Sequence, residues 1–164
     1  MNAAIAVRRG DRADRDFVRD LGRRSATSSV SAVREARFEN VVTAFDRLTA
    51  FVYERHHDAL IAEEDGERVG FLLLLYDVPD EVTLTDQGFV AYTAVEPHAR
   101  GRGVGRALLE RAEELARGAG LHYVSLMVTE ENDPARRLYA SAGYATEGIT
   151  YPSYRALWRA LASA

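Results

Sequence analysis

Two amino acids are missing from this chain of 164 residues, which contains neither cysteine nor lysine. Without cysteine there is no disulfide framework, no thiolate metal site and no cysteine nucleophile, so an acyl transfer cannot pass through a thioester on the protein. Without lysine there is no phosphate-loop lysine and no Schiff-base lysine. All 21 basic residues are arginine, and a bias in genome composition explains that usage better than a functional choice does.

Long apolar runs and an excess of positive charge are also missing. The longest apolar run, Val69 to Tyr76, is far too short to cross a bilayer, and the apolar residues 3–7 lack the preceding positive charge of a secretory signal. A formal net charge of -4 is unfavourable for a general nucleic-acid binder. We therefore expect a cytoplasmic protein that acts on a small molecule or peptide, with no nucleic acid and no membrane as partner.

The remaining composition is that of an ordinary globular protein, with 47% hydrophobic and 28% charged residues. No linker rich in proline, glycine or serine divides the chain, and its length is typical of one domain. We therefore expect a single domain over residues 1–164.

The first third of the chain is predicted to be mostly helical. Ile5 and Val7 indicate a short strand, and apolar spacing predicts a helix over Asp14 to Arg23. The serine-rich stretch Ser25 to Ser31 is predicted to be a loop. One long helix or two abutting helices are predicted over Ala32 to Arg55.

The rest of the chain combines hairpins with alternating strands and helices. Two apolar runs flank Asp65-Gly66, the strongest short hairpin signal, and Glu63 and Glu64 beside it are interpreted as solvated charges. The predicted elements are strands over residues 59–62 and Val69 to Tyr76, a connection over Asp77 to Asp86, a strand over Gly88 to Val95, a helix over Gly105 to Gly118, a strand over Tyr123 to Val128, a helix over Pro134 to Ala142 capped by Asp133, and a strand over Tyr144 to Ile149. Tyr154 to Leu161 fits either a strand or a helix. This order predicts an α/β sandwich with a mixed sheet.

A glycine-rich turn between a strand and a helix is the most informative stretch. Residues 100–105 are Arg-Gly-Arg-Gly-Val-Gly, shortly after Val95-Glu96-Pro97. The first amides of a helix have no internal partner, and glycine lets the backbone approach an anion closely, so this turn is suited to phosphate. Arg100, Arg102 and Arg106 add positive charge at the same place. For any one of these residues taken singly, a tight connection with solvated arginines is the alternative.

The glycine spacing bears on which phosphate ligand fits. A dinucleotide fold requires Gly-x-Gly-x-x-Gly, whereas the third glycine here comes one residue early and an antiparallel meander precedes the loop. The phosphate loop of NTPases requires a lysine. A nucleotide-binding oxidoreductase is therefore a weakened rival.

Two motifs together resemble the GNAT superfamily of acetyl-CoA-dependent acyltransferases. Arg100 to Gly105 fits the pyrophosphate-binding pattern of that family, and the Val-x-Pro element before it is also typical. A second family motif is intact at Asn132, Ala135, Leu138, Tyr139, Gly143 and Tyr144. The resemblance is strong over residues 60–150 and weak over the N-terminal helices.

The resemblance implies a GNAT fold, an α/β fold whose mixed, mostly antiparallel sheet is splayed open at the acetyl-CoA cleft and flanked by helices. The cleft would lie between the strand ending at Val95 and the strand Tyr123 to Val128. A β-bulge near Val95 would offer a free N–H that polarises the thioester carbonyl. Helices over residues 11–55 would form the acceptor side, and residues 60–150 the acetyl-CoA-binding core.

The resemblance also implies site residues. Those assigned to acetyl-CoA are Val95, Arg100, Gly101, Arg102, Gly103, Val104, Gly105, Arg106, Asn132 and Ala135. Asn132 is equally suited to capping a helix. Tyr139 stands where the family places a tyrosine that protonates the departing CoA thiolate, and a tyrosine packed in the core is the alternative.

The predicted function is therefore an N-acetyltransferase that moves an acetyl group from acetyl-CoA to a primary amine by direct attack in a ternary complex. A catalytically weak acetyl-CoA-binding sensor or regulatory module of the same fold is the alternative. The general base stays open, because Asp86 and Gln87 stand where some relatives carry a glutamate. The four histidines lack metal-ligand spacing, so no metal is expected. The sequence leaves open the acceptor amine and the choice between monomer and homodimer.

Overall fold

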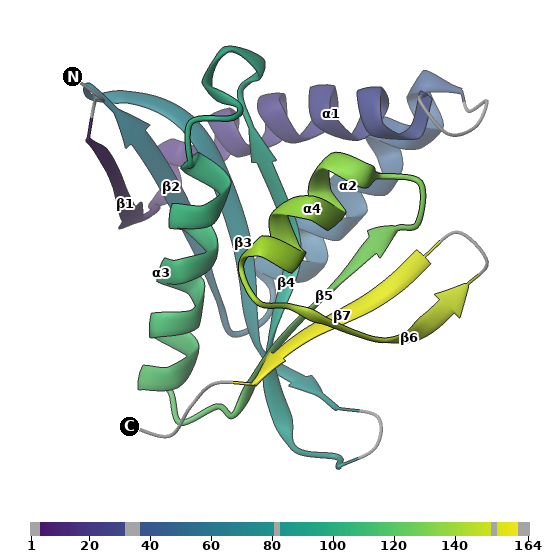
Figure 1. Cartoon of the computed structure of the whole chain (residues 1–164). Helices are drawn as coiled ribbons and strands as arrows, with labels where there is room; N and C mark the ends of the chain where they lie inside the picture. The colour runs from purple at the N-terminus through teal and green to yellow at the C-terminus, as the bar shows by residue number, and fades with distance from the viewer. Residues whose placement is uncertain (1–3, 32–36, 81–82, 152–153, 161–164) are drawn as a thin grey trace.

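The computed structural model describes residues 4–31, 37–80, 83–151 and 154–160, which form one sheet with helices on both faces (Figure 1). In chain order the elements are β1 (Ile5–Arg9), η1 (Arg12–Asp14), α1 (Arg15–Ser31), α2 (Phe38–Tyr53), β2 (His57–Glu64), β3 (Glu67–Pro79), β4 (Asp86–Val95), η2 (Pro97–Ala99), α3 (Val104–Gly118), β5 (Tyr123–Thr129), α4 (Asp133–Ser141), β6 (Ala145–Tyr151) and β7 (Tyr154–Ala160). The α/β fold predicted from the sequence is confirmed.

The strands lie in the order β1-β2-β3-β4-β5-β7-β6. The paired neighbours in this sheet are antiparallel except for β4 and β5, which run parallel. The predicted hairpin turns at Asp65 and Gly66, whose φ angles of 52° and 82° are the two positive values that a type I′ turn requires. The segment that fitted either a strand or a helix is strand β7, which pairs with both β5 and β6.

The sheet opens between β4 and β5. Their parallel pairing is confined to residues 88–90 of β4 and residues 124–126 of β5, although β4 continues to Val95. Beyond this point β4 stays paired with β3, while β5 stays paired with β7. Figure 1 shows the two strands diverging from their short contact, so the predicted splay of the sheet is confirmed.

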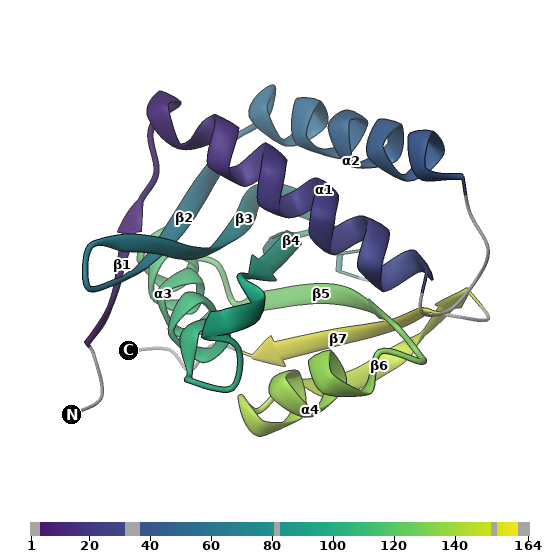
Figure 2. The same cartoon turned by 90° about the horizontal axis from the view of Figure 1, so that it is seen from above.

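The two faces of the sheet carry separate hydrophobic cores (Figure 2). Helices α3 and α4 cover one face, and α1 and α2 cover the other. Strand β3 lies between them and is buried without interruption from Val69 to Tyr76, which explains its long apolar run. In the part of the chain that the structure describes, no helix is both long enough and apolar enough to cross a membrane.

Helix α1 extends further than the sequence predicts. The stretch Ser25–Ser31, predicted to be a loop, forms the last part of this helix. Ala26 is buried and Val30 packs against the core that α1 and α2 share. The Thr27 hydroxyl donates to the Arg23 carbonyl at 2.9 Å, a bond that keeps this polar side chain within the helix. Packing therefore outweighs the modest helix propensity of serine.

Other boundaries differ by a few residues. Helix α2 begins at Phe38, and residues 32–36 of the predicted long helix lie outside the described part. Strand β3 continues to Pro79, so the connection to β4 is shorter than predicted, and its residues 81–82 are also outside the described part. Helix α4 is capped by Asn132 and not by Asp133, which is its first residue.

The predicted β-bulge lies further back along β4 than the resemblance implied. Leu73 and Leu74 are neighbours in β3, but they pair with Tyr92 and Val90 of β4. Ala91 is therefore the extra residue of the bulge. No register shift is present beside Val95, where the bulge was expected. A bulge bends its strand and increases the local twist, and Ala91 directly follows the last β4 residue that pairs with β5. The bulge therefore marks the point where the sheet opens.

Gly22 allows α1 to approach α2 closely, and its replacement is a test of that packing. A Cβ built at Gly22 would lie 1.9 Å from Cζ of Phe45. We expect Gly22→Ala to lower the free energy of unfolding by about 1–3 kcal/mol, since overpacking outweighs a gain in helix propensity of roughly 1 kcal/mol at most. Gly118→Ala is the matched control, because a Cβ there meets nothing within 4 Å. Equal stability of the two variants in urea denaturation would contradict this account.

Candidate functional site

The glycine-rich loop follows β4 and leads into α3. Gly101 and Gly103 have φ angles of 74° and 93°, values that favour glycine. The Ala107 N–H donates to the Gly103 carbonyl at 3.0 Å and closes the first turn of α3. The amides of residues 104–106 therefore precede the hydrogen-bonded part of the helix, at the positive end of its dipole. This arrangement is suited to binding a phosphate group.

Each of the three arginines around the loop holds a neighbouring element. The contacts are Arg100 Nε to the Val95 carbonyl at 3.1 Å, Arg102 Nη2 to Glu64 Oε1 at 2.8 Å, and Arg106 Nη2 to Ser141 Oγ at 2.9 Å. A guanidinium has five N–H donors, so each arginine keeps donors for an anion while it holds the loop in place. The structure therefore adds a positioning role to the predicted binding role.

The prediction that the hairpin charges are solvated is wrong for Glu64. Glu64 is only 8% exposed, and its carboxylate contacts Arg102 of the loop. Glu63 is also paired, since it accepts a hydrogen bond from Arg8 Nε at 2.8 Å. The β2–β3 hairpin therefore braces the loop from the side of β1. Sequence reasoning could not predict this contact, because Glu64 and Arg102 are far apart in the chain.

The edge of β4 that faces the opening carries backbone hydrogen-bonding groups. The Glu96 N–H donates to the Val69 carbonyl of β3 at 2.8 Å. Because successive residues of a strand direct their backbone groups to alternate sides, those of Thr93 and Val95 are directed away from β3, towards the opening. The described part of β5 does not pair with β4 at these residues. An extended ligand can therefore pair with this edge as a further strand does.

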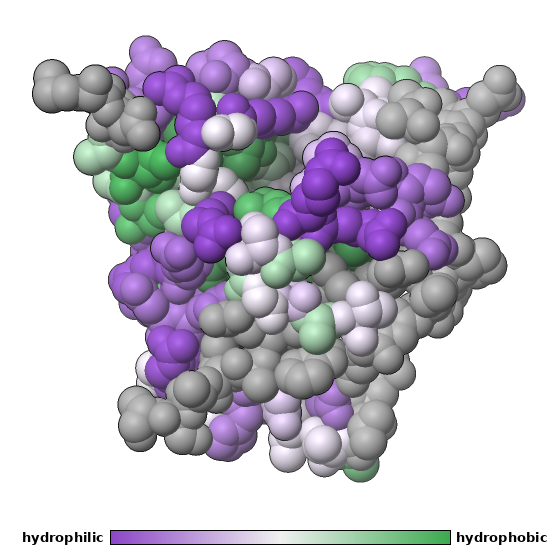
Figure 3. All heavy atoms as spheres, in the orientation of Figure 1, coloured by the Kyte–Doolittle hydropathy of each residue, from purple (hydrophilic) through white to green (hydrophobic). Residues whose placement is uncertain are grey.

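Helix α4 brings the second motif next to the loop. Asn132 Oδ1 accepts the Ala135 N–H at 3.3 Å, which confirms the capping role of Asn132. A Cβ built at Gly105 would lie 2.8 Å from Cδ2 of Leu138, so α3 and α4 pack closely at this glycine. Figure 3 shows hydrophilic residues around the loop and over α4, with the surface hollowed between them. The two motifs therefore meet at one opening.

Tyr139 is buried, at 6% exposure, in the core on the α3 face. Its ring centroid lies 6.0 Å from that of Tyr144. Burial, with a smaller contribution from Tyr92, raises the pKa of Tyr139 to about 12. The phenol therefore keeps its proton throughout the neutral range. It packs as a core residue on the α3 face.

Tyr92 and Ser25 contact each other across the α1 face of β4, and the sequence reasoning did not single them out. Tyr92 follows the bulge of β4, and its hydroxyl lies 3.4 Å from Ser25 Oγ of α1. Its ring packs edge-on against Phe45 at 5.0 Å and stacks with Phe71 at 6.1 Å. Tyr92 belongs to the core on the α1 and α2 face, so it and Tyr139 approach the opening from opposite faces of the sheet. Sequence reasoning could not find this pair, because Ser25 and Tyr92 are far apart in the chain.

A pair of charges links α1 to the end of β4. Arg24 of α1 donates to both carboxylate oxygens of Glu96, at 2.7 and 3.1 Å. Arg24 lowers the pKa of Glu96, which makes this carboxylate a poor proton acceptor. Asp86 and Gln87 lie at the opposite end of β4, away from the loop. Within the described ranges no group of three or more His, Asp or Glu side chains is placed to hold a metal ion.

Comparison with known proteins agrees with this geometry. The model of a family described as the acetyltransferase (GNAT) family matches residues 26–144. A mycothiol acetyltransferase from Beutenbergia cavernae is 37% identical over 84 residues, a match that covers 51% of this chain and 27% of that protein. The match therefore spans only about a quarter of that relative's length.

Solved structures share the fold at low sequence identity. An N-acetyltransferase from Thermoplasma acidophilum in complex with coenzyme A has a TM-score of 0.73 and 17% identity, over 96% of this chain and 99% of that one. A Salmonella typhimurium protein with its cofactor acetyl-CoA has a TM-score of 0.69 and 19% identity, over 98% and 96% of the two chains. At this level of identity the likeness concerns the fold alone.

The raised pKa of Tyr139 predicts when its phenol ionises. We expect the ring signals of Tyr139 to stay at the neutral-phenol position up to pH 11. They are followed by NMR in tyrosine-labelled protein, and the Tyr139→Phe variant assigns them. A tyrosine in an unfolded chain is mostly ionised at pH 11, since its pKa is about 10. Because the folded state holds this proton more tightly, its contribution to stability is lost as the pH rises from about 10 to 12. A midpoint near pH 10 would show that the phenol is solvated.

Proposed function

This chain belongs to the GNAT family of acetyltransferases, and we propose that it is an N-acetyltransferase that transfers the acetyl group of acetyl-CoA to a primary amine of a small molecule or peptide. The observation that carries the proposal is the meeting of three features at one opening of the sheet. These are the glycine-rich loop, the edge of β4 that lacks a partner in the described part of β5, and the buried phenol of Tyr139.

Acetyl-CoA is proposed to bind along the loop and the open edge of β4. The amides of residues 104–106 and the guanidinium groups of Arg100, Arg102 and Arg106 would hold the pyrophosphate. The pantetheine arm would pair with the backbone of Thr93 and Val95 as an added strand. The Asn132 cap and Ala135 would form the wall on the side of α4. The positive φ angles of Gly101 and Gly103 support this assignment, because they let the backbone approach the phosphates closely.

The proposed reaction is direct attack, since the chain has no cysteine to carry the acetyl group. The neutral amine nitrogen attacks the thioester carbonyl carbon and forms a tetrahedral intermediate. The carbon–sulfur bond then breaks, and the thiolate takes the proton of the Tyr139 hydroxyl while the new amide nitrogen loses its extra proton to solvent. Tyr139 regains a proton from solvent. With a pKa near 12 the phenol is fully protonated before each turnover.

The acceptor amine is proposed to enter from the face covered by α1 and α2. Tyr92 lies on that face and its ring is held between Phe45 and Phe71, so its hydroxyl has little freedom of position. Together with the Ser25 hydroxyl it offers lone pairs to an incoming N–H group. The thioester would then lie between Tyr92 on the acceptor side and Tyr139 on the leaving-group side. Tyr92 is a positioning residue in this arrangement, and Tyr139 donates the proton.

Gly103→Ala tests the loop. Alanine at a φ of 93° is strained, so the backbone must shift and the first-turn amides move with it. We expect the Kd for acetyl-CoA, measured by calorimetry, to rise by about tenfold or more, with Gly118→Ala as a control that binds normally. Gly105 is a less specific position, because a side chain there meets Leu138. Unchanged affinity in Gly103→Ala would remove the loop from the binding site.

Phenylalanine at each of the two tyrosines tests their separate roles. We expect Tyr139→Phe to lower kcat by about 10²- to 10⁴-fold and to leave acetyl-CoA binding unchanged. Tyr92→Phe should instead raise KM for the amine by about tenfold and change kcat little, since one hydrogen bond to the acceptor is lost. Single-turnover rates over an amine panel separate chemistry from product release. A wild-type rate in Tyr139→Phe would exclude it as the acid, and binding of acetyl-CoA without turnover on any amine would favour a sensor.

A further inference from the structure

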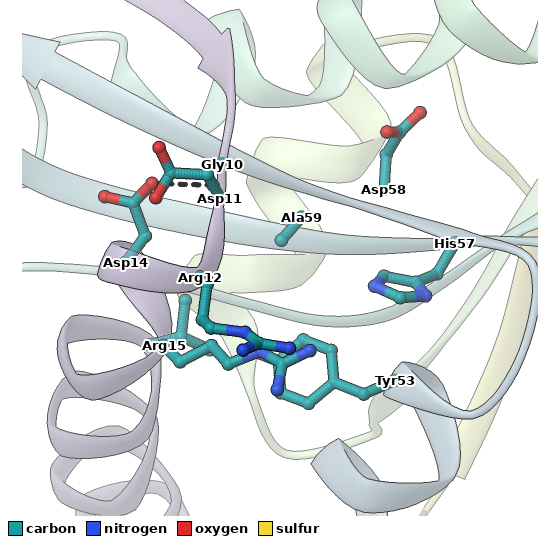
Figure 4. Close-up of a pocket in the computed structure, with 10 residues that line it drawn as sticks. Gly10, Asp11, Arg12, Asp14, Arg15, Tyr53, His57, Asp58 and Ala59 are labelled. Atoms are coloured by element: carbon teal, nitrogen blue, oxygen red, sulfur yellow. Dashed lines mark hydrogen bonds between the residues drawn. The ribbon is translucent and has the colours of Figure 1, made fainter.

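A second cavity lies on the α1 and α2 face, apart from the opening between β4 and β5. It has a volume of about 190 Å³ and is formed where β1 turns into α1, where α2 ends and where β2 begins. Figure 4 shows the side chains that line it. Neither the glycine-rich loop nor α4 contributes a residue to its wall. The proposed acetyl-CoA site therefore does not account for this cavity.

Two guanidinium groups converge in this cavity. Arg12 of η1 and Arg15, the first residue of α1, extend side by side next to the ring of Tyr53 (Figure 4). The guanidinium carbon of Arg15 lies 4.6 Å from the Tyr53 ring centroid, a stacking contact that fixes its direction. Within the described residues neither arginine forms an ion pair with a carboxylate. Both charges are permanent, since arginine does not deprotonate in proteins.

The carboxylates that line the cavity are already engaged by other groups. Asp14 pairs with Arg8 at 2.7 Å and with Arg68 at 3.4 Å, and the hydrogen bond from Arg8 holds the pKa of Asp14 at about 2.

The other two carboxylates have partners as well. Asp58 pairs with Arg9 at 3.2 Å and accepts the Tyr76 hydroxyl at 2.6 Å. Asp11 accepts the Ala13 N–H at 2.7 Å as the cap of η1. Asp14 and Asp58 therefore already have cationic partners, and within the described residues none of the three carboxylates forms an ion pair with Arg12 or Arg15.

Arg12 and Arg15 are exposed residues close to the start of α1, so two positive charges lie near each other there. Like charges three residues apart in a helical segment repel each other. Cations at the start of a helix also oppose the helix dipole. An anion between Arg12 and Arg15 would relieve both effects and would accept several charge-assisted N–H bonds at once. The cavity volume of about 190 Å³ accommodates a small oxyanion, since one water occupies only about 30 Å³.

We propose that this cavity binds a small oxyanion, a carboxylate or phosphate group, between the guanidinium groups of Arg12 and Arg15. The ring of Tyr53 forms one wall, and His57 lies on the far side of the cavity (Figure 4). His57 Nδ1 lies 2.8 Å from the Arg55 carbonyl. Because a carbonyl only accepts, Nδ1 carries a hydrogen and the ring is held in place. His57 is therefore a local reporter of the site.

The experiment follows the ring signals of His57 by NMR while anions are added. The chain has four histidines, and His57→Gln assigns the signal. Sodium phosphate and sodium acetate are added in separate titrations at constant pH and at ionic strength balanced with sodium chloride. Coenzyme A is present throughout, so that the glycine-rich loop does not compete for the added anion. The readout is independent of acetyl transfer, and a failure here leaves the proposed enzyme untouched.

We expect the His57 signals to shift and then saturate as phosphate, acetate or both are added. The anion that causes the shift identifies the group that binds. Arg12→Gln and Arg15→Gln should each raise the Kd by about tenfold, as the loss of one charged partner predicts. Arg47→Gln is the matched control, because Arg47 is exposed on α2 and does not line the cavity. Thermal unfolding checks that the variants fold. The absence of a saturable shift with either anion, or an equal loss in Arg47→Gln, would overturn the proposal.

Discussion

The parallel contact between β4 and β5 stops after residue 90, and the rest of the molecule is arranged around that limit. Backbone N–H and C=O groups that lose a strand partner need another one. Strand β5 obtains it from β7, which is paired along the whole of β5. Strand β4 remains paired with β3 on one side only. The bulge at Ala91, the loop before α3 and the phenol on α4 all lie around the edge of β4 that is left open.

Elements that depend on local signals could be predicted from the sequence, and elements that depend on distant contacts could not. The Asp65-Gly66 turn and the α3 helix follow from glycine placement and apolar spacing, and the structure confirms both. The helical Ser25–Ser31 segment depends on packing against α2, and the burial of Glu64 depends on Arg102. The roles of the loop residues and of Tyr139 stay predictions, because the structure shows their positions and not their chemistry.

Arginine replaces lysine throughout, and this affects how the elements are joined. A guanidinium binds a carboxylate through two N–H groups in a fixed plane, which an ammonium cannot do. Arg23 joins α1 to Asp46 of α2 in this way, and Arg24 joins α1 to Glu96 at the end of β4. The proposed acceptor side is therefore linked directly to the strand that precedes the phosphate-binding loop. Exposed ion pairs of this kind add little stability, but their planar geometry restricts how α1 is oriented.

The position of β7 between β5 and β6 has a consequence for the order of folding. During synthesis β5 is made before residues 154–160, its main pairing partner. Until β7 is added, β5 is paired only through its short contact with β4, and its other edge is exposed to association with other chains. The hairpin of β6 and β7 adds to the outer edge of β5, and such pairing between residues distant in the chain slows folding. The opening between β4 and β5 therefore has both of its walls only after the last part of the sheet has been added, and a chain interrupted before β7 would resemble an aggregation-prone intermediate.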